Sequence, residues 1–404
     1  MTGFALNGIH VPFTIDVLGS ERVDVTAAVG RIAAADIAAL SACPPHSESL
    51  RDGYVLASPG IERDGGYFYP VVGEIAAGTR SVPFLTAGNA CRIFTGGMIP
   101  EGGERVVVQE ECREEGQGVW VAADAQRRER LFINMAGSEI PCGEVVVAQG
   151  TRLEVDHLAL FASAGVYQVP VIRRPKVACF CTGSELVAVG GRLETGQKLS
   201  LNSLLLQNLV PCYGGVICEQ GLISDNHQAI AKIFGTLTDG HCDLVVSTGG
   251  MGPGKYDLVK NAFCAAGGTV ILEALPMHPG RSILLGTLAG TVFIALPGPP
   301  NAVRTLINEF VGPVLLMMQG AKRCWPLAVQ ARLLHDYWVR ESDLLQVRGG
   351  VLTMDGGCAV RIAGRLDPTS CFILFAAGRR DFAKGELVQV HLSPTSIDGL
   401  LFHL

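Results

Sequence analysis

The chain has 404 residues, of which 48% are hydrophobic and 17% are charged, and its formal net charge is −6. This composition is typical of a well-buried globular protein, and the length suits about two to four domains. A negative balance without a long basic run argues against a nucleic-acid surface. The sequence shows no basic and apolar leader and no run of about 18 apolar residues, so we expect a cytoplasmic protein without membrane segments.

Thirteen cysteines are scattered singly along the chain, without a C-x-x-C pair. An odd total argues against a disulfide framework, and buried small apolar side chains are the more common role of such residues. We therefore expect free thiols. The nine histidines also lack metal-ligand spacing.

The composition changes in blocks along the chain. Residues 1–40 mix helical and extended stretches, and residues 41–146 contain short apolar runs between glycine- and proline-rich turns, which predicts a β-rich domain. A helix and a connector follow in residues 147–174. Residues 175–321 alternate apolar strands with amphipathic helices, which predicts a parallel sheet covered on both faces. Residues 322–404 return to short strands and suit a small β-barrel or sandwich.

The segment "DLVVSTGGMGPGKYDLVKNAF", residues 243–263, predicts a strand, a glycine-rich turn and a helix that opens at Tyr256 and Asp257. Such a turn can point free N–H groups at an anion, and a helix N-terminus adds partial positive charge. Its spacing fits neither the Walker pattern nor a dinucleotide fingerprint, so a plain connection is the alternative. The glycines concerned are Gly249, Gly250, Gly252 and Gly254.

Three strands of the predicted sheet end in glycine-containing turns. In open α/β sheets, ligands bind outside the carboxyl ends of the strands, so a shared rim favours a real binding site. The rim residues are Thr182 and Gly183, Ser247 and Thr248, and Pro297 and Gly298.

Three carboxylates stand close to these turns in the sequence: Glu185, Asp225 and Asp257. Asp225 could instead cap the helix that follows it, and Asp257 could be an ordinary charge at a helix start. Carboxylates beside an anion-binding turn also suggest a divalent cation that bridges them to phosphate.

Several motifs fall in the order and at the separations of the MoeA family, the molybdopterin molybdotransferases related to the E domain of gephyrin. The resemblance covers nearly the whole chain. It implies a multidomain α/β plus β fold: a segmented N-terminal domain (1–40 and 147–174), an inserted β-rich domain (41–146), a molybdopterin-binding doubly wound α/β domain (175–321) and a C-terminal β-barrel-like domain (322–404). The motifs are "SLRDGYVL", "GEIAAG", "RIFTGGMIPEG", "TGSEL", "STGGMGPGKYD", "HPGRS" and "ALPGPPNAV".

The resemblance also implies an activity. Such an enzyme takes adenylylated molybdopterin, releases AMP and inserts molybdate, or tungstate, between the dithiolene sulfurs with the help of Mg²⁺. The family works as a homodimer whose site combines the α/β domain of one subunit with N-terminal parts of the other. Further partners would be a Mog-type adenylyltransferase or a molybdoenzyme.

Carried over by motif, Asp52 matches the essential aspartate of the family, although a turn residue before Gly53 is the alternative. Thr95 and Gly96 match its Thr-Gly turn. The resemblance makes Glu185, Asp225 and Asp257 the remaining catalytic carboxylates, and assigns Asp225 and Asp257, with Glu139, to the metal. The rim and turn residues named above would bind the pterin substrate, together with His278, Arg281 and Pro300.

The sequence departs from the family pattern within the motifs that carry the active-site residues. Arg51 replaces a methionine, Glu139 replaces an aspartate, and a K-P-G-K-P loop reads His278-Pro279-Gly280-Arg281-Ser282. The element G-N-P becomes Gly298-Pro299-Pro300. Two other functions therefore stay open: a non-catalytic molybdopterin carrier or chaperone, and a Mog-type adenylyltransferase.

Overall fold

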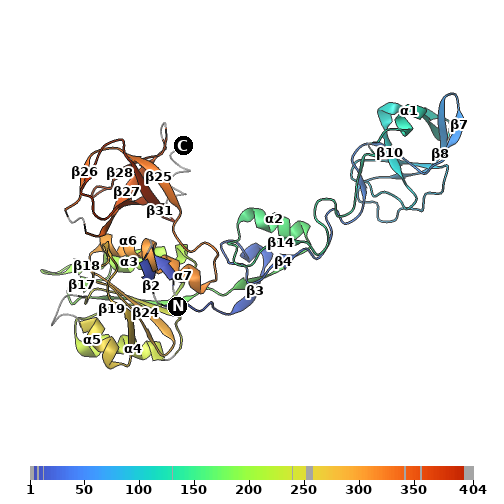
Figure 1. The fold of residues 1–404 in the computed structure, drawn as a ribbon. Coiled ribbons are helices and arrows are strands. Elements are labelled where there is room, and N and C mark those ends of the chain that lie inside the picture. The colour runs from blue at the N-terminus through green and yellow to red at the C-terminus, as the bar shows by residue number, and fades with distance from the viewer. Residues whose placement is uncertain are drawn as a thin grey trace. The chain divides into compact units, whose positions relative to one another are not determined.

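The computed structural model describes residues 4–6, 9–11, 13–129, 131–238, 240–251, 258–340, 343–354 and 357–394 (Figure 1). The chain forms two compact units. One unit comprises Met1–Glu21, Gly30–Ile32 and Ile172–Leu404, and the other comprises Arg22–Val29 and Ala33–Val171. The chain passes between the units near β3 (Ser20–Asp24) and β15 (Gln168–Ile172). The four-domain division stays a prediction.

The first unit is built on a six-stranded sheet in the order β19-β16-β20-β24-β23-β21. The expected parallel pairing is confirmed for β19, β16, β20 and β24, but β23 pairs antiparallel with both β24 and β21. The reversal is a two-residue hairpin, Ala289-Gly290, whose φ angles of 50° and 85° suit a tight turn between twisted strands. The bounds are β16 (Lys176–Thr182), β19 (Val216–Ile223), β20 (Leu244–Thr248), β21 (Thr269–Leu272), β23 (Leu284–Leu288) and β24 (Thr291–Leu296).

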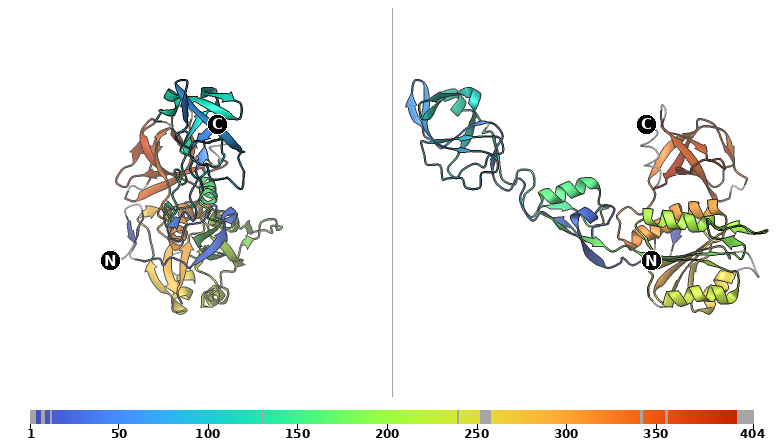
Figure 2. Two further views of the ribbon diagram at one scale, coloured as in Figure 1. Left: turned by 90° about the vertical axis from the view of Figure 1, so that its right-hand side faces the viewer. Right: turned by 180° about the vertical axis from the view of Figure 1, so that it is seen from behind.

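Helices cover both faces of this sheet, as Figures 1 and 2 show. One face packs against α3 (Leu201–Cys212), α6 (Pro300–Leu306) and α7 (Gly312–Met318), and the other packs against α4 (His227–Thr238) and α5 (Leu258–Ala265). Strands β20 and β24 are buried at every residue, which explains their nearly continuous apolar sequences.

A five-residue π-helical segment, Ile307–Val311, joins α6 to α7. It buries Asn308 and Glu309, and the Nδ2 of Asn308 donates to Glu309 Oε1 at 2.9 Å. Glu309 Oε2 lies 2.7 Å from Nδ1 of His391, which belongs to the C-terminal strands. A buried carboxylate therefore has a partner at each oxygen, as burial of a charge requires.

The C-terminal strands close into a five-stranded barrel, because β29 pairs back onto β27 in the order β27-β28-β25-β31-β29. The short strand β22 (Met277–His278) extends this sheet beside β27. The expected barrel is confirmed. Its strands are β25 (Ala328–Leu333), β27 (Leu345–Thr353), β28 (Ala359–Ile362), β29 (Cys371–Phe375) and β31 (Leu387–Leu392).

The second unit contains a β-rich part around the strand order β10-β6-β9-β8-β12-β11, with β7 paired to β8. The same unit holds α2 (Val155–Ser163) and the strand pair β4 (Ile37–Ala38) and β14 (Val145–Val147). The sheet strands are β6 (Gly53–Leu56), β7 (Ile61–Arg63), β8 (Gly66–Ile75), β9 (Ala90–Ile93), β10 (Arg105–Val108), β11 (Cys112–Glu115) and β12 (Gly118–Ala122).

Across the described residues, the helices are too short or too polar for any of them to cross a bilayer.

Candidate functional site

The ends of β16, β20 and β24 lie side by side, as the sequence predicts. Thr182 Oγ1 donates to the carbonyl of Thr248 at 3.3 Å, and the N–H of Gly249 donates to the carbonyl of Leu296 at 3.0 Å. These bonds tie the three strand ends into one rim at the carboxyl edge of the sheet, where an open α/β fold binds its ligands.

Glycine is required in the turn after β20. Gly249 and Gly250 have φ angles of 88° and 66°, and a Cβ at Gly249 would lie 2.5 Å from the carbonyl oxygen of Thr182. The expectation that Gly249 offers a free N–H is wrong, because that group already bonds Leu296. The N–H of Gly250 bonds no other described residue, whereas Gly252 and Gly254 lie outside the described residues.

The side chains of Ser247 and Thr248 are fully buried. These two side chains therefore pack inside the domain, and only the backbone of the strand end reaches the rim. Asn202, in the first turn of α3, connects two strand ends of the rim. Its Nδ2 donates to Thr248 Oγ1 at 3.2 Å and to the carbonyl of Gly298 at 2.8 Å. Sequence reasoning missed Asn202, because one polar residue at the start of a helix carries no distinguishing pattern.

Asp225 lies beside this rim and is exposed. Its N–H donates to Ser184 Oγ at 3.1 Å, and Ser184 follows the strand end at Thr182 and Gly183. The capping interpretation of Asp225 is wrong, because Asn226 caps α4 by accepting the N–H of Ala229 at 2.7 Å. Its carboxylate is thus not used for capping. Glu185 is exposed in the same turn, and Asp257 lies outside the described residues.

The three predicted metal ligands fall in different parts of the chain, and Asp257 lies outside the described residues. Glu139 belongs to the second unit, where its Oε1 accepts from Asn134 Nδ2 at 3.4 Å, whereas Asp225 belongs to the first. Among the described residues, no group of three or more His, Cys, Asp or Glu side chains is placed to hold a metal ion.

The altered loops lie at defined places in the first unit. His278 ends β22, opposite Gln346 of β27, and Arg281 is exposed three residues later. Pro300 is the first residue of α6, a position where proline is favourable because its missing N–H would have no helical acceptor. Gly298 and Asn301 are exposed, and Pro297 is half-buried.

Asp52 directly precedes β6 in the second unit. Both the N–H and Oγ1 of Thr95 donate to its Oδ1, each at 2.8 Å. The backbone hydrogen bond first, and the hydroxyl bond second, hold the pKa of the Asp52 carboxyl below its usual value. Gly96 follows with a φ of 77°, so the Thr-Gly turn needs its glycine.

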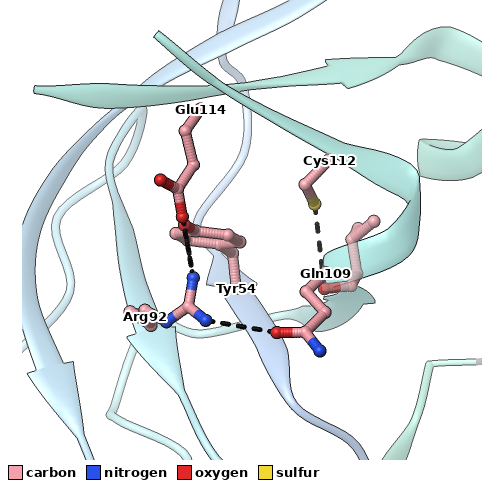
Figure 3. A network of polar contacts seen from close by, with 6 residues as sticks. Tyr54, Arg92, Gln109, Cys112 and Glu114 are labelled. Atoms are coloured by element: carbon pink, nitrogen blue, oxygen red, sulfur yellow. Dashed lines mark hydrogen bonds and ion pairs between the residues drawn. The ribbon is translucent and has the colours of Figure 1, made fainter. Parts of the chain in front are cut away.

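A polar network adjoins Asp52 (Figure 3). Arg92 Nη1 donates to Tyr54 Oη at 2.8 Å and to Glu114 Oε1 at 2.9 Å, and Nη2 donates to Gln109 Oε1 at 3.1 Å. The N–H of Gln109 also donates to the carbonyl of Asp52 at 3.1 Å. Tyr54, Arg92, Gln109 and Glu114 line a cavity of about 300 Å³. The Arg92 charge further lowers the pKa of Asp52. No sequence pattern predicts this network.

Comparison with known proteins assigns the chain to a family. Residues 5–165 match the MoeA N-terminal region (domain I and II), and residues 178–317 match a probable molybdopterin binding domain. A molybdopterin molybdenumtransferase of Nostoc sp. is 31% identical, over 83% of this chain and 78% of that relative. The chain belongs to the MoeA family.

Other members of the MoeA family agree over most of the chain. A molybdopterin molybdenumtransferase of Staphylococcus epidermidis is 27% identical over 93% of this chain and 91% of its own length. The crystal structure of a molybdopterin biosynthesis MoeA protein from Pyrococcus horikosii aligns with a TM-score of 0.82 and 26% identity, over 94% of this chain and 95% of that one. The MoeA-like fold, with its α/β domain and closed C-terminal barrel, is therefore confirmed.

Proposed function

We propose that this protein inserts molybdate, or tungstate, into adenylylated molybdopterin and releases AMP. One observation carries the proposal: the exposed Asp225, freed from capping, lies beside the rim that Thr182, Thr248 and Gly249 form. The relatives named molybdopterin molybdenumtransferases support the same activity.

The rim suits the phosphate end of such a substrate. The N–H of Gly250 would face the phosphate oxygens, since N–H groups in a turn before a helix favour an anion. Thr182, Gly183, Pro297, Gly298 and Pro300 would shape the surrounding surface. Asn202 would hold this surface in register through its bonds to Thr248 and Gly298.

The carboxylates would act on the phosphoanhydride. We assign Asp52, Glu185, Asp225 and Asp257 to this step, in which water attacks one phosphorus of the phosphoanhydride, the bond to the bridging oxygen breaks, and AMP and the molybdopterin phosphate are the two products. Thr95 would orient Asp52, because its two hydrogen bonds fix one oxygen of the carboxylate.

Mg²⁺ remains a prediction for this chain. Asp225 and Asp257, with Glu139, are the residues that would hold it, but the described carboxylates do not form a metal site by themselves. When bound, a divalent cation would offset the charge of the phosphates.

The oxyanion would meet His278 and Arg281. Arg281 can hold an oxyanion through two N–H groups of its guanidinium. We further propose a cytoplasmic homodimer, whose mass in solution would be twice that of one chain. A Mog-type adenylyltransferase that supplies the substrate, or a molybdoenzyme that accepts the product, would be its partner.

The test incubates the purified protein with adenylylated molybdopterin, Mg²⁺ and either molybdate or tungstate, and follows AMP by chromatography. Steady AMP release that requires an oxyanion is expected. Binding of the pterin without turnover under both conditions would refute the transferase and support the carrier.

A further inference from the structure

Two thiols of the first unit lie in contact. Cys218 Sγ and Cys242 Sγ are 3.2 Å apart, only about 1 Å beyond the length of an S–S bond. Both residues are free cysteines in the structure. We propose that Cys218 and Cys242 form an oxidisable dithiol, which a hydroperoxide converts into a disulfide.

The backbone holds both cysteines in place. Cys218 is the extra residue of a bulge in β19, because Ile217 pairs with Val177 and Glu219 pairs with the next residue of β16. Cys242 stands two residues before β20, and its carbonyl accepts the hydroxyl of Thr291 at 3.2 Å. The thiols therefore meet without a rearrangement of the chain.

The next residue anchors Cys242 further. The Asp243 carboxylate accepts two bonds from the Arg173 guanidinium, at 2.6 and 2.7 Å, and one from the N–H of Lys176 at 2.8 Å. These contacts lie at the amino ends of β16 and β20, the opposite edge of the sheet from the rim. Oxidation here would leave the rim residues themselves unmodified.

The two thiols differ in their access to solvent. Cys218 is exposed, whereas Cys242 is 6% exposed within the apolar cluster beneath α4. Burial first, and then the hydrogen bond with Cys218 and the nearby charges of Glu219 and Asp243, raise the pKa of Cys242 to about 12. Cys218 is therefore the sulfur that a dissolved oxidant meets, and Cys242 is the one that completes the bond.

The chemistry balances in two steps. The Cys218 thiolate attacks one hydroperoxide oxygen, the O–O bond breaks, and the departing oxygen takes a proton, which leaves a sulfenic acid on Cys218. The Cys242 sulfur then attacks the Cys218 sulfur, the S–O bond breaks, and the hydroxide leaves as water with the Cys242 proton. Two thiols lose two electrons in total, and the hydroperoxide gains them.

The disulfide would close a loop that carries Asp225 and α4. Closing such a loop restricts the unfolded chain and should raise the melting temperature, by about 5 °C for a loop of roughly 25 residues. This inference does not depend on the proposed transferase activity, because its readout is covalent.

The experiment uses the full-length protein, reduced with dithiothreitol, desalted and then treated with hydrogen peroxide. Mass spectrometry should show a loss of about 2 Da, reversed by dithiothreitol. Trypsin should yield a linked pair of peptides, residues 199–232 and residues 233–255, with the link assigned to Cys218 and Cys242 by fragmentation. Cys218→Ser should abolish the link and the rise in melting temperature.

Cys212→Ser is the matched control, because Cys212 lies in the same tryptic peptide as Cys218. This variant should keep both the link and the shift. The proposal is overturned if peroxide takes Cys218 to sulfinic or sulfonic acid without a link, or if the link survives in Cys218→Ser. Since Cys218 is exposed, that variant should fold, and Cys242→Ala provides a second one.

Discussion

Thr95 donates two hydrogen bonds to the same carboxylate oxygen of Asp52, one from its backbone nitrogen and one from Oγ1, each 2.8 Å long. Thr95, two residues after the end of β9, thus fixes the orientation of this carboxylate. Arg92, which pairs with Tyr54 of β6 one residue before the end of β9, adds a positive charge nearby. These contacts lower the pKa of the Asp52 carboxyl and orient its side chain.

Thr95→Ala tests this relationship. The folded-state pKa of Asp52 lies below its ordinary value of 3.8, so its contribution to stability is present above that value and is lost as the pH falls through the lowered pKa. Loss of the hydroxyl should move the acid limb of the activity profile to higher pH. Near pH 7 the carboxylate is ionised either way, so a fall in kcat of about tenfold there would come from misorientation. Thr95→Ser should restore activity, and equal profiles for parent and Thr95→Ala would refute the role.

Asp225 and Asn226 form a matched pair of neighbours with different roles. Asp225→Asn should lower turnover about a hundredfold and leave the melting temperature nearly unchanged, since this carboxylate does not cap α4. Asn226→Ala should remove the cap, cost about 1 kcal/mol of stability and keep most of the turnover. Steady-state kinetics and thermal unfolding of both variants decide the assignment, which fails if the two effects are exchanged.

Gly249 and Gly298 offer a second matched pair on the rim. A Cβ at Gly249 would lie 2.5 Å from the Thr182 carbonyl oxygen at a φ of 88°, whereas a Cβ at Gly298 would meet nothing within 4 Å. Gly249→Ala should therefore distort the turn and weaken pterin binding, at a cost of about 1–3 kcal/mol. Gly298→Ala should have little effect on the fold. Calorimetric titration with molybdopterin measures the affinity of both variants. An unchanged affinity in Gly249→Ala would show that the turn is a plain connection.

His278 and Arg281 should both affect the affinity for the oxyanion. If His278 occupies the place of a lysine that neutralises the oxyanion, His278→Lys should strengthen binding, because it restores a permanent charge at this position. Arg281→Ala should weaken binding, because it removes a guanidinium that can hold an oxyanion through two N–H groups. Titrations with molybdate and tungstate measure both effects. An identical affinity in parent and His278→Lys would make position 278 an ordinary loop residue.

The sequence predicts the rim well because the pattern that indicates it is local. Strands β16, β20 and β24 are continuous apolar runs that end in Thr-Gly or Pro-Gly, and parallel strands bring such ends to one edge. The helices could be predicted equally well, because the spacing of their apolar residues gives each helix one face that packs against the sheet.

Other features depend on contacts between residues far apart in the chain. Asn202 lies 46 residues from Thr248, and Arg92 lies 22 residues from Glu114. No local sequence pattern predicts such pairs. The cap of α4 shows a subtler limit: Asp225 and Asn226 are both good capping residues, and only the backbone geometry decides between them. The antiparallel edge of the sheet was missed because its hairpin turn, Ala289-Gly290, lacks the usual Asn or Asp.

The most direct measurement is a single-turnover reaction of the purified protein with a limiting amount of adenylylated molybdopterin, with and without molybdate. Quenched samples are assayed for AMP and for molybdenum-loaded pterin. The proposed transferase activity predicts that both products form in a one-to-one ratio when molybdate is present, and that Asp225→Asn slows both together. Pterin that stays bound and adenylylated, with no AMP released over many hours, would contradict it.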